Sequence, residues 1–294
     1  MASKRATFSS KILPYWLVLP QLAVTLIFFI WPAAQALWQS LLRQDAFGFK
    51  TSFVWFANYT ALFADPLYVQ SVGTTFIFSI AVAALSIGLG LMFAVAVDRL
   101  ARKGGGYTTL LVWPYAVAPA VAGTLWWFLF NPTIGLVARA LQALGYNWNP
   151  ILYGPDALVL VIVAASWKQI PYCFIFFLAG LQSIPRALIE AAAIDGAGPL
   201  KRFWTIIFPL LAPTSFFLLV INLIYALFDT FAVIDATTEG GPAQATNILV
   251  YKVFQDGYVG LNLGASAAQS VLLMALVILL TVIQFRFIER RIAY

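Results

Sequence analysis

Histidine is absent from this sequence, cysteine occurs once, and charged residues make up only 10% of its 294 residues. Without histidine, the chain has no Ser/His triad, no His-ligated metal site and no neutral-pH proton shuttle of the usual kind. The single Cys173 lies in an apolar run, where one thiol forms no internal disulfide and is more often a small core residue than a nucleophile. We therefore expect no catalytic residue, no metal ligand and no cofactor on this chain, and we do not expect an enzyme.

Hydrophobic residues account for 62% of the chain, which leaves too little polar surface for a soluble globule of this size. A helix needs about 20 apolar residues to cross roughly 30 Å of hydrocarbon, where its backbone amides must bond within the segment. The sequence therefore predicts an all-α integral membrane protein. Six runs fit transmembrane helices, and together with a cytoplasmic loop over 183–211 they form one domain over 1–294: 12–32, 71–97, 108–130, 157–182, 212–233 and 264–288.

Lysine and arginine predict the orientation, because cytoplasmic flanks retain positive charge. They cluster at the amino terminus, after the second and fourth runs, and at the carboxyl end: Lys4, Arg5, Lys11; Arg99, Arg102, Lys103; Arg186, Lys201, Arg202; Arg286, Arg290, Arg291. The remaining loops carry only Arg43, Lys50, Arg139 and Lys252. Both termini are therefore predicted to be cytoplasmic. The basic residues form no stripe or aromatic-interleaved patch, so nucleic acid is not an expected partner.

Three shorter segments also carry expectations. The run at 12–32 follows basic residues and precedes Ala34-Gln35-Ala36, as in a cleaved signal, but its length of about 20 residues favours a retained span. Residues 134–144 are either a short interfacial helix whose end Trp148 anchors, or a simple surface loop. The glycines at 104–106 indicate a tight turn, since no Walker sequence follows them.

The loop after the fourth run predicts a short helix. Pro185 can open it, the Glu/Ala-rich stretch favours it, and Gly196 with Pro199 ends it. The alanines at 191–193 give a slim face that fits a groove in a partner, with the charges of Glu190 and Asp195 near the ends. The alternative is a connector resting on the membrane surface, although such connectors usually carry bulky apolar anchors opposite Lys or Arg.

This loop resembles the EAA loop of binding-protein-dependent ABC importer permeases: Glu190-Ala191-Ala192, three residues, Gly196, nine residues, then Ile206-Ile207-Phe208-Pro209, with Phe208 in place of the family's leucine. The resemblance implies a type I permease fold in the bacterial inner membrane. It implies that Glu190, Ala191, Ala192, Asp195 and Gly196 dock in a cleft of an ATPase subunit, which binds ATP and Mg. It also implies two such ATPase subunits, a second, different permease chain that completes a heterodimer, and a periplasmic substrate-binding protein.

Other segments resemble a particular group within this permease family. Asn58-Tyr59 with Leu62, Asp65 and Pro66, and Gly240-Gly241-Pro242 with Thr246 and Tyr251, resemble the outside loops of carbohydrate-type permeases. Residues 111–122, 128–132 and 228–235 resemble permeases of sn-glycerol-3-phosphate importers. This implies uptake of sn-glycerol-3-phosphate, or a related glycerophosphodiester, by alternating access. A neutral sugar is the alternative substrate. An ion-coupled secondary transporter is the rival class, but it usually shows internal repeats and ion-coupling acids at mid-membrane.

Lys168 lies near the centre of the fourth run, where a charge costs about 3 kcal/mol. Either end of the helix is about 16 Å away, whereas a lysine snorkels about 6 Å. It must therefore face a wet cavity or a partner, and the two candidates are a structural ion pair with Asp229 and an anionic ligand in transit. Trp167, Gln169 and Tyr172 offer stacking and hydrogen bonds beside it. On the fifth run, four residues either face the same substrate path or bond between helices: Asn222, Tyr225, Asp229 and Thr230.

Overall fold

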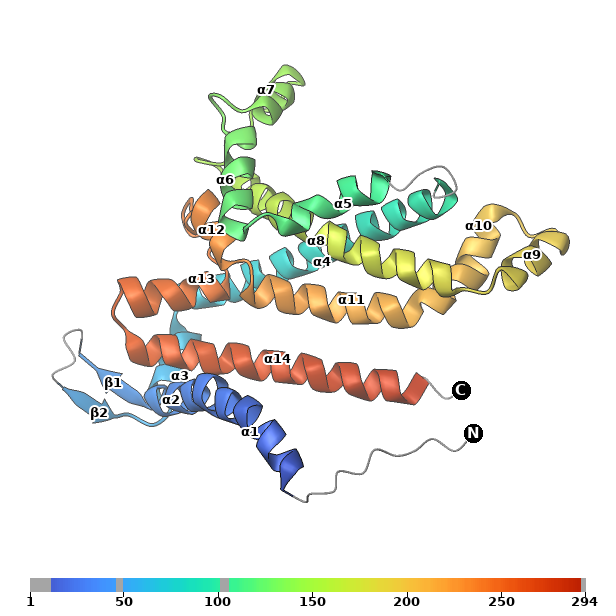
Figure 1. Cartoon of the computed structure of the whole chain (residues 1–294). Coiled ribbons are helices and arrows are strands. Elements are labelled where there is room, and N and C mark those ends of the chain that lie inside the picture. Colours follow the sequence, from blue (N-terminus) through green and yellow to red (C-terminus); the bar gives the residue numbers. More distant parts are fainter. Residues whose placement is uncertain (1–11, 46–49, 101–105, 292–294) are drawn as a thin grey trace.

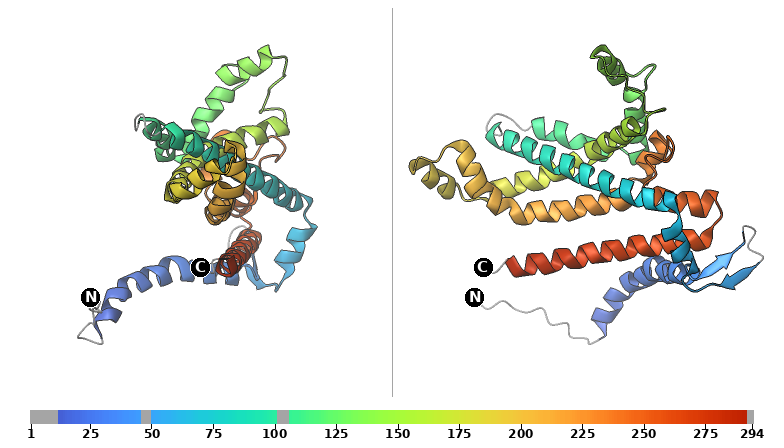
Figure 2. Two further views of the ribbon diagram at one scale, coloured as in Figure 1. Left: turned by 90° about the vertical axis from the view of Figure 1, so that its right-hand side faces the viewer. Right: turned by 180° about the vertical axis from the view of Figure 1, so that it is seen from behind.

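Four long helices form the body of the protein in the computed structural model, which describes residues 12–45, 50–100 and 106–291. They are α4 (Pro66–Leu100), α8 (Gly154–Ser183), α11 (Phe208–Phe228) and α14 (Leu263–Arg291). α4, α8 and α11 pack on one another, and α14 packs on α11 (Figures 1 and 2).

The amino-terminal part packs on this body through α14. α1 (Leu13–Thr25), the π-helical turn η1 (Leu26–Ile30) and α2 (Trp31–Gln39) follow one another without a break, and α2 contacts α14. Next come an antiparallel hairpin, β1 (Leu42–Gln44) with β2 (Thr51–Phe53), which pairs Leu42 with Phe53, and then α3 (Ala57–Ala64).

Short elements occupy the two ends of the long helices. α9 (Arg186–Ile194), α10 (Pro199–Arg202) and the π-helical turn η3 (Phe203–Ile207) lie between α8 and α11. At the opposite end lie the hairpin, α12 (Phe231–Thr237), and the junction of α13 (Leu249–Phe254), η4 (Gln255–Val259) and α14. α14 ends toward the end where α9 projects (Figure 1).

Within the described ranges, five helical stretches are long and apolar enough to cross a membrane: Leu13–Gln39, Pro66–Asp98, Gly154–Ser183, Pro199–Phe228 and Leu263–Arg286. A bent pair, α5 (Gly106–Ala116) with α6 (Pro119–Phe130), makes six if it counts as one span. Each predicted run overlaps one of these segments. The fifth differs most, because its helix ends at Phe228 and the predicted residues 229–233 belong to a turn and to α12.

The predicted span over 108–130 is not one continuous helix. α5 and α6 meet at a bend of 102°. Ala118 precedes a proline and has extended backbone (φ −60°, ψ 141°), because a proline ring disfavours helical conformation in the residue before it. Pro119 then occupies the first turn of α6, where its missing N–H costs nothing.

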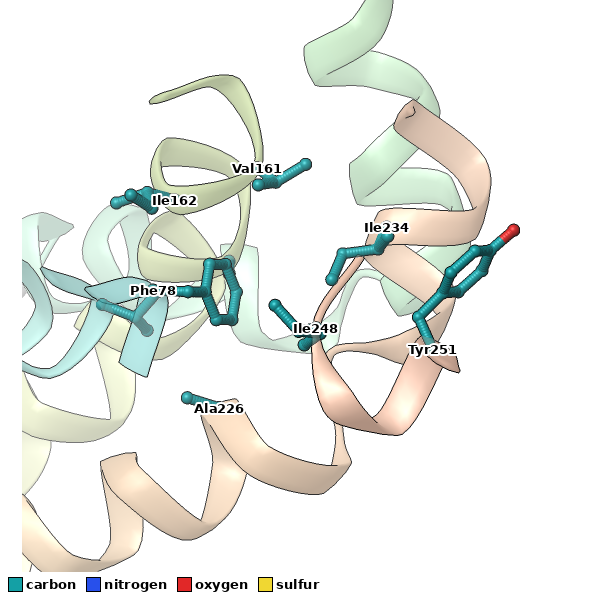
Figure 3. Packing of buried hydrophobic residues seen from close by; sticks show 9 residues of the cluster. Phe78, Val161, Ile162, Ala226, Ile234, Ile248 and Tyr251 are labelled. Atoms are coloured by element: carbon teal, nitrogen blue, oxygen red, sulfur yellow. The ribbon is translucent and has the colours of Figure 1, made fainter. Parts of the chain in front are cut away.

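Apolar side chains from five helices meet around Phe78 of α4. Val161 and Ile162 come from α8, Ala226 from α11, Ile234 from α12 and Tyr251 from α13 (Figure 3). Small residues let helices approach elsewhere: a Cβ at Gly90 of α4 would lie 2.5 Å from Cys173 Cβ of α8. Cys173 is accordingly buried between the two helices, where its small volume is needed.

Of the two alternatives for 134–144, a short helix or a surface loop, the structure has the helix, α7 (Leu136–Ala143). Trp148 is only 4% exposed, and its Nε1–H donates to Phe130 O at 2.9 Å. It therefore ties the loop to α6 and is not a membrane-interface anchor. The predicted glycine turn is described only at Gly106, which begins α5, because 104–105 lie outside the described residues. The basic residues of the amino terminus also lie outside them, as do Arg102 and Lys103.

Candidate functional site

Lys168 lies on α8 opposite the break between α5 and α6, and is 7% exposed. Its Nζ donates to Tyr115 O at 3.4 Å and, more closely, to Val117 O. These carbonyls stand at the end of α5, where the helix dipole is negative. Backbone dipoles therefore stabilise the buried ammonium.

An open cavity of about 650 Å³ lies beside this lysine, between the helix break, α8 and α11. Its walls come from Tyr115, Ala116, Val117, Ala118, Pro119, Lys168, Gln169, Tyr172, Ile221, Ile224, Tyr225 and Asp229. The predicted substrate-path residues Lys168, Gln169, Tyr172, Tyr225 and Asp229 thus meet around one space, although they come from two helices far apart in the sequence.

The cavity offers a cation, an amide, phenol groups and a carboxylate. Tyr172 stacks on Tyr115 at 6.2 Å between ring centroids, and the Tyr225 hydroxyl donates to Ala165 O at 3.3 Å. Asp229 directly follows α11 and is exposed. Such a space suits a small ligand that carries a negative charge at one end and hydroxyl groups at the other.

Three other predicted path residues lie away from the cavity. Trp167 packs edge-on against Trp113 and Trp126 and lines a separate, mostly apolar hollow. Asn222 is fully buried, and its Nδ2 donates to Cys173 Sγ and Leu218 O. Thr230 is also buried and donates to Ala226 O. The contact of Asn222 with Cys173 is a bond between helices, the alternative that the sequence left open, whereas Thr230 bonds to a carbonyl one turn back along α11.

The sequence also left open an ion pair between Lys168 and Asp229. Across the described part of the chain, the ammonium of Lys168 forms no ion pair; carbonyl groups and the Tyr115 ring, 6.0 Å from Nζ, are its neighbours. Asp229 follows α11 and lines the same cavity as Lys168, which lies on α8. Both charged side chains therefore border the cavity without forming an ion pair with each other.

The predicted short helix after the fourth span is α9, and its end explains Gly196. The N–H of Ala197 donates to Ala192 O, and the N–H of Gly196 donates to Ala193 O, which is the Schellman pattern. Gly196 takes φ +79°, a left-handed conformation that favours glycine. Gly196 thus lets the chain reverse directly after the helix.

α9 presents an exposed surface on this chain. Glu190, Ala191, Asp195 and Gly196 are exposed, whereas Ala192 is half-buried. Large apolar side chains surround them, namely Leu188, Ile194 and Leu200. On the other side, Ile189 packs against a core cluster that includes Phe177 and Leu211. The helix is therefore fixed to α8 and α11 at its base and free to contact a partner.

A second polar cluster was missed by the sequence reasoning. Lys252, 5% exposed, binds Asp256 at 3.1 Å and Asp65 at 3.6 Å, and Gln269 donates to Asp256. Lys252 and Asp256 are spaced i,i+4, a signal that the sequence contains. The cluster lines a cavity of about 230 Å³ and connects α3, α13 and α14.

The outside-loop motifs form structural contacts. Asn58 Nδ2 donates to Ser40 O and Leu42 O, and the Tyr59 hydroxyl donates to Ser40 Oγ. In the last loop, Tyr251 packs against Gly240 and donates to Asp235 at 3.3 Å. Burial, together with the neighbouring Asp235 carboxylate, raises the pKa of Tyr251 to about 12. Its hydroxyl therefore stays protonated at neutral pH and acts as a donor.

Long apolar helices, a polar cavity beside a broken helix and an exposed short helix between two of the long ones are features of a multi-spanning membrane permease. Residues 86–294 match the family of binding-protein-dependent transport system inner membrane components. The chain belongs to this family, and it is an inner-membrane permease of the ABC importer class.

Named relatives cover the whole chain. It is 59% identical over 291 residues, 99% of both chains, to the sn-glycerol-3-phosphate transport system permease protein UgpA of Brucella abortus. The protein of that name from Rhizobium meliloti is also 59% identical over 291 residues, with 99% of both chains covered. That from Yersinia enterocolitica is 57% identical over 294 residues, with both chains fully covered.

Solved structures agree in fold. A chain of a bacterial ABC transporter for import of the acidic polysaccharide alginate superimposes with a TM-score of 0.77 at 21% identity, covering 96% of each chain. A chain of the inward-facing MetNI methionine ABC transporter gives a TM-score of 0.52 at 17% identity, over 80% of this chain and 98% of that one. At these identities the likeness concerns the fold alone.

Proposed function

We propose that this chain is the permease subunit of an ATP-driven importer that moves sn-glycerol-3-phosphate across the inner membrane by alternating access. The observation that carries the proposal is the ammonium of Lys168, which lies beside an open cavity with carbonyl groups as its polar partners. The full-length relatives named as sn-glycerol-3-phosphate permeases, including those at 57% and 59% identity, support this substrate.

A phosphate monoester suits this site because it carries a charge of about −1.5 to −2 at neutral pH. A hydrogen bond to a charged group contributes about 1.5–3 kcal/mol, so the ammonium discriminates strongly between a phosphate and a neutral sugar. Gln169, Tyr172 and Asp229 remain available for the hydroxyl groups of the glycerol part. A glycerophosphodiester keeps one negative charge and would use the same lysine.

The coupling surface is α9 with the turn after it, where Glu190, Ala191, Ala192, Asp195 and Gly196 dock on an ATPase subunit. The exposure of this helix and its fixed base on the body of the protein support that role. ATP and Mg bind the ATPase subunits, and this chain supplies no catalytic group. α9 and both chain termini are on the cytoplasmic side, an arrangement supported by the direction in which α14 ends.

The complete transporter contains a second, homologous permease chain, two ATPase subunits and a periplasmic binding protein. One chain of this fold supplies half of a translocation path. The helices from Leu13 to Gln39 leave large apolar side chains uncovered on this chain, including Trp16, Phe28 and Trp31. Lipid and the second permease cover such surfaces in the assembled complex.

The substrate is tested with the purified complex in proteoliposomes, using Lys168→Met and Lys168→Arg. Loss of one charged hydrogen bond of about 1.5–3 kcal/mol predicts a ~10- to 100-fold lower uptake of sn-glycerol-3-phosphate for Lys168→Met. Lys168→Arg keeps the charge and retains a larger part of the uptake. ATP hydrolysis stimulated by the loaded binding protein should fall together with uptake.

This experiment has two controls, one for assembly of the complex and one for the choice of substrate. Lys168→Met must still copurify with the other subunits, which separates loss of transport from loss of assembly. Wild-type complex is offered sn-glycerol-3-phosphate, a glycerophosphodiester and a neutral sugar. Preferred uptake of the neutral sugar, or unchanged uptake by Lys168→Met, would refute the proposed substrate and its contact.

The coupling surface is tested with a matched pair of glycines. Gly196→Ala forces a side chain into a left-handed conformation, at a cost of about 1–2 kcal/mol, whereas Gly198 has φ −65° and open space around it. We expect Gly196→Ala to lower the amount of copurified ATPase subunit and the uptake several-fold, and Gly198→Ala to change neither. Equal behaviour of the two variants would argue against docking through this turn.

A further inference from the structure

Pro119 leaves one carbonyl without its normal partner at the break in the third span. In a continuous helix, the carbonyl of Tyr115 would accept a hydrogen bond from the N–H four residues later. That residue is Pro119, which has no N–H. An unbonded carbonyl inside a membrane protein costs free energy, so this position needs a donor from elsewhere.

Lys168 supplies the missing donor from another helix. Its Nζ donates to Tyr115 O on the α5 side of the bend and to Val117 O within it. An ammonium has three N–H groups, so two of them hold the bend and one remains for the cavity. The same charged group is therefore attached to the hinge and exposed to the ligand space.

We propose that Lys168 makes the bend between α5 and α6 sensitive to the charge of the substrate, an inference that rests on the proposed function. Without a ligand, the ammonium clamps Tyr115 O and Val117 O and holds the 102° bend. An anionic ligand draws the ammonium into the cavity and releases the clamp. A neutral ligand of similar size leaves it in place.

The two hydrogen bonds from Lys168 to carbonyl oxygens differ in strength. The bond to Tyr115 O is long at 3.4 Å, and hydrogen bonds of this length are weak. A phosphate oxygen carries negative charge, so it attracts the ammonium more strongly than a neutral carbonyl group does. A phosphate therefore displaces Tyr115 O, on the α5 side of the bend, before it displaces Val117 O.

A change in the bend would move α12, because α6 packs against it at the end of the molecule opposite α9. A Cβ at Gly123 of α6 would lie 2.9 Å from Val233 O of α12, so these two helices are in close contact. α12 follows α11 by a short turn that contains Asp229 of the cavity wall. Rotation of α6 about the break thus moves α12 relative to the cavity.

The experiment measures the bend directly in the assembled transporter in lipid nanodiscs. Spin labels are placed in a Cys173→Ala background at Leu110 of α5 and Phe128 of α6, both of which are exposed on this chain. Distances are recorded by pulsed electron resonance with the binding protein and sn-glycerol-3-phosphate, and with glycerol as the neutral control. We expect sn-glycerol-3-phosphate to shift the mean distance and glycerol to leave it unchanged.

Variants of Lys168 distinguish its hold on the bend from a simple contact with the substrate. Lys168→Met should show the shifted distance without ligand and no further response, and Lys168→Arg should regain the response. Pro119→Ala restores an N–H for Tyr115 O, so in that background Lys168→Met should no longer alter the unliganded distance. A Lys168→Met complex with lost uptake but an unchanged distance would overturn the hinge while leaving the substrate contact intact. Normal uptake with a shifted distance would instead overturn the contact with substrate.

Discussion

Lys168 and Lys252 are both almost completely buried, at 7% and 5% exposed, yet their surroundings differ in kind. Lys252 binds two carboxylates, Asp256 at 3.1 Å and Asp65 at 3.6 Å. Lys168 binds backbone carbonyls at a helix break and borders a cavity of about 650 Å³. Two lysines that are equally buried thus differ in whether carboxylates neutralise their charge, and the proposed function assigns the ligand contact to Lys168, which has no carboxylate partner among the described residues.

The physical reason is charge balance. Carboxylates neutralise Lys252 permanently, and the cluster ties α13 to the segment before α4 and, through Gln269, to α14. Carbonyl dipoles orient and stabilise the ammonium of Lys168 but leave its net charge in place. Under the proposed function, that charge attracts the anionic substrate, so Lys252 contributes stability and Lys168 contributes selectivity.

The largest expected effect is on stability, from Lys252→Met. Removing the ammonium leaves Asp65 and Asp256 uncompensated, and breaking a buried pair costs about 3–5 kcal/mol. Both carboxylates are partly exposed, so we expect about 2 kcal/mol here, seen as a thermal midpoint several degrees lower for the purified complex. Lys201→Met, at an exposed lysine, serves as the control and should shift the midpoint little.

Lys168→Met belongs in the same thermal series. This substitution removes two hydrogen bonds to carbonyl groups but leaves no carboxylate without its partner, so we expect it to destabilise the complex by less than Lys252→Met does. A Lys168→Met complex that unfolds at a lower temperature than Lys252→Met would reverse the comparison between the two sites.

A smaller effect is the coupling between Lys252 and Asp256. The double variant Lys252→Met with Asp256→Asn removes both charges, so no uncompensated carboxylate remains at that position. We expect it to be about 1 kcal/mol more stable than the sum of the two single changes indicates, because groups in one ion pair are not additive. Additive thermal shifts would mean that the pair contributes no interaction energy.

Several features could be predicted from the sequence because they depend on local pattern. Long apolar runs specify the spans, Glu190 to Gly196 specify α9 and its turn, and a lone charge in an apolar run marks Lys168. The cavity face was also readable in part, since Tyr172 follows Lys168 by four residues and shares its side of the helix. Trp167 and Gln169 lie about 100° to either side of Lys168, so spacing alone does not tell which of the two borders the cavity.

The features that the sequence did not yield depend on contacts between distant segments. Pro119 was visible, but whether a proline kinks a span or divides it depends on a donor for the freed carbonyl, and Lys168 is far along the chain. In the same way, Asp65 and Lys252 belong to different loops, and nothing local pairs them. Tertiary packing decides both.

The smallest expected effect tests which face of α8 meets the substrate. Gln169 is 5% exposed and lines the cavity, whereas Trp167 packs against Trp113 and Trp126 beside a different hollow. Loss of one neutral hydrogen bond of about 1 kcal/mol in Gln169→Leu predicts a roughly fivefold higher substrate concentration for half-maximal uptake. Trp167→Phe keeps an aromatic ring in its cluster and should leave this concentration unchanged. A larger effect from Trp167→Phe than from Gln169→Leu would place the substrate on the opposite face, and Lys168 would then share the structural role of Lys252.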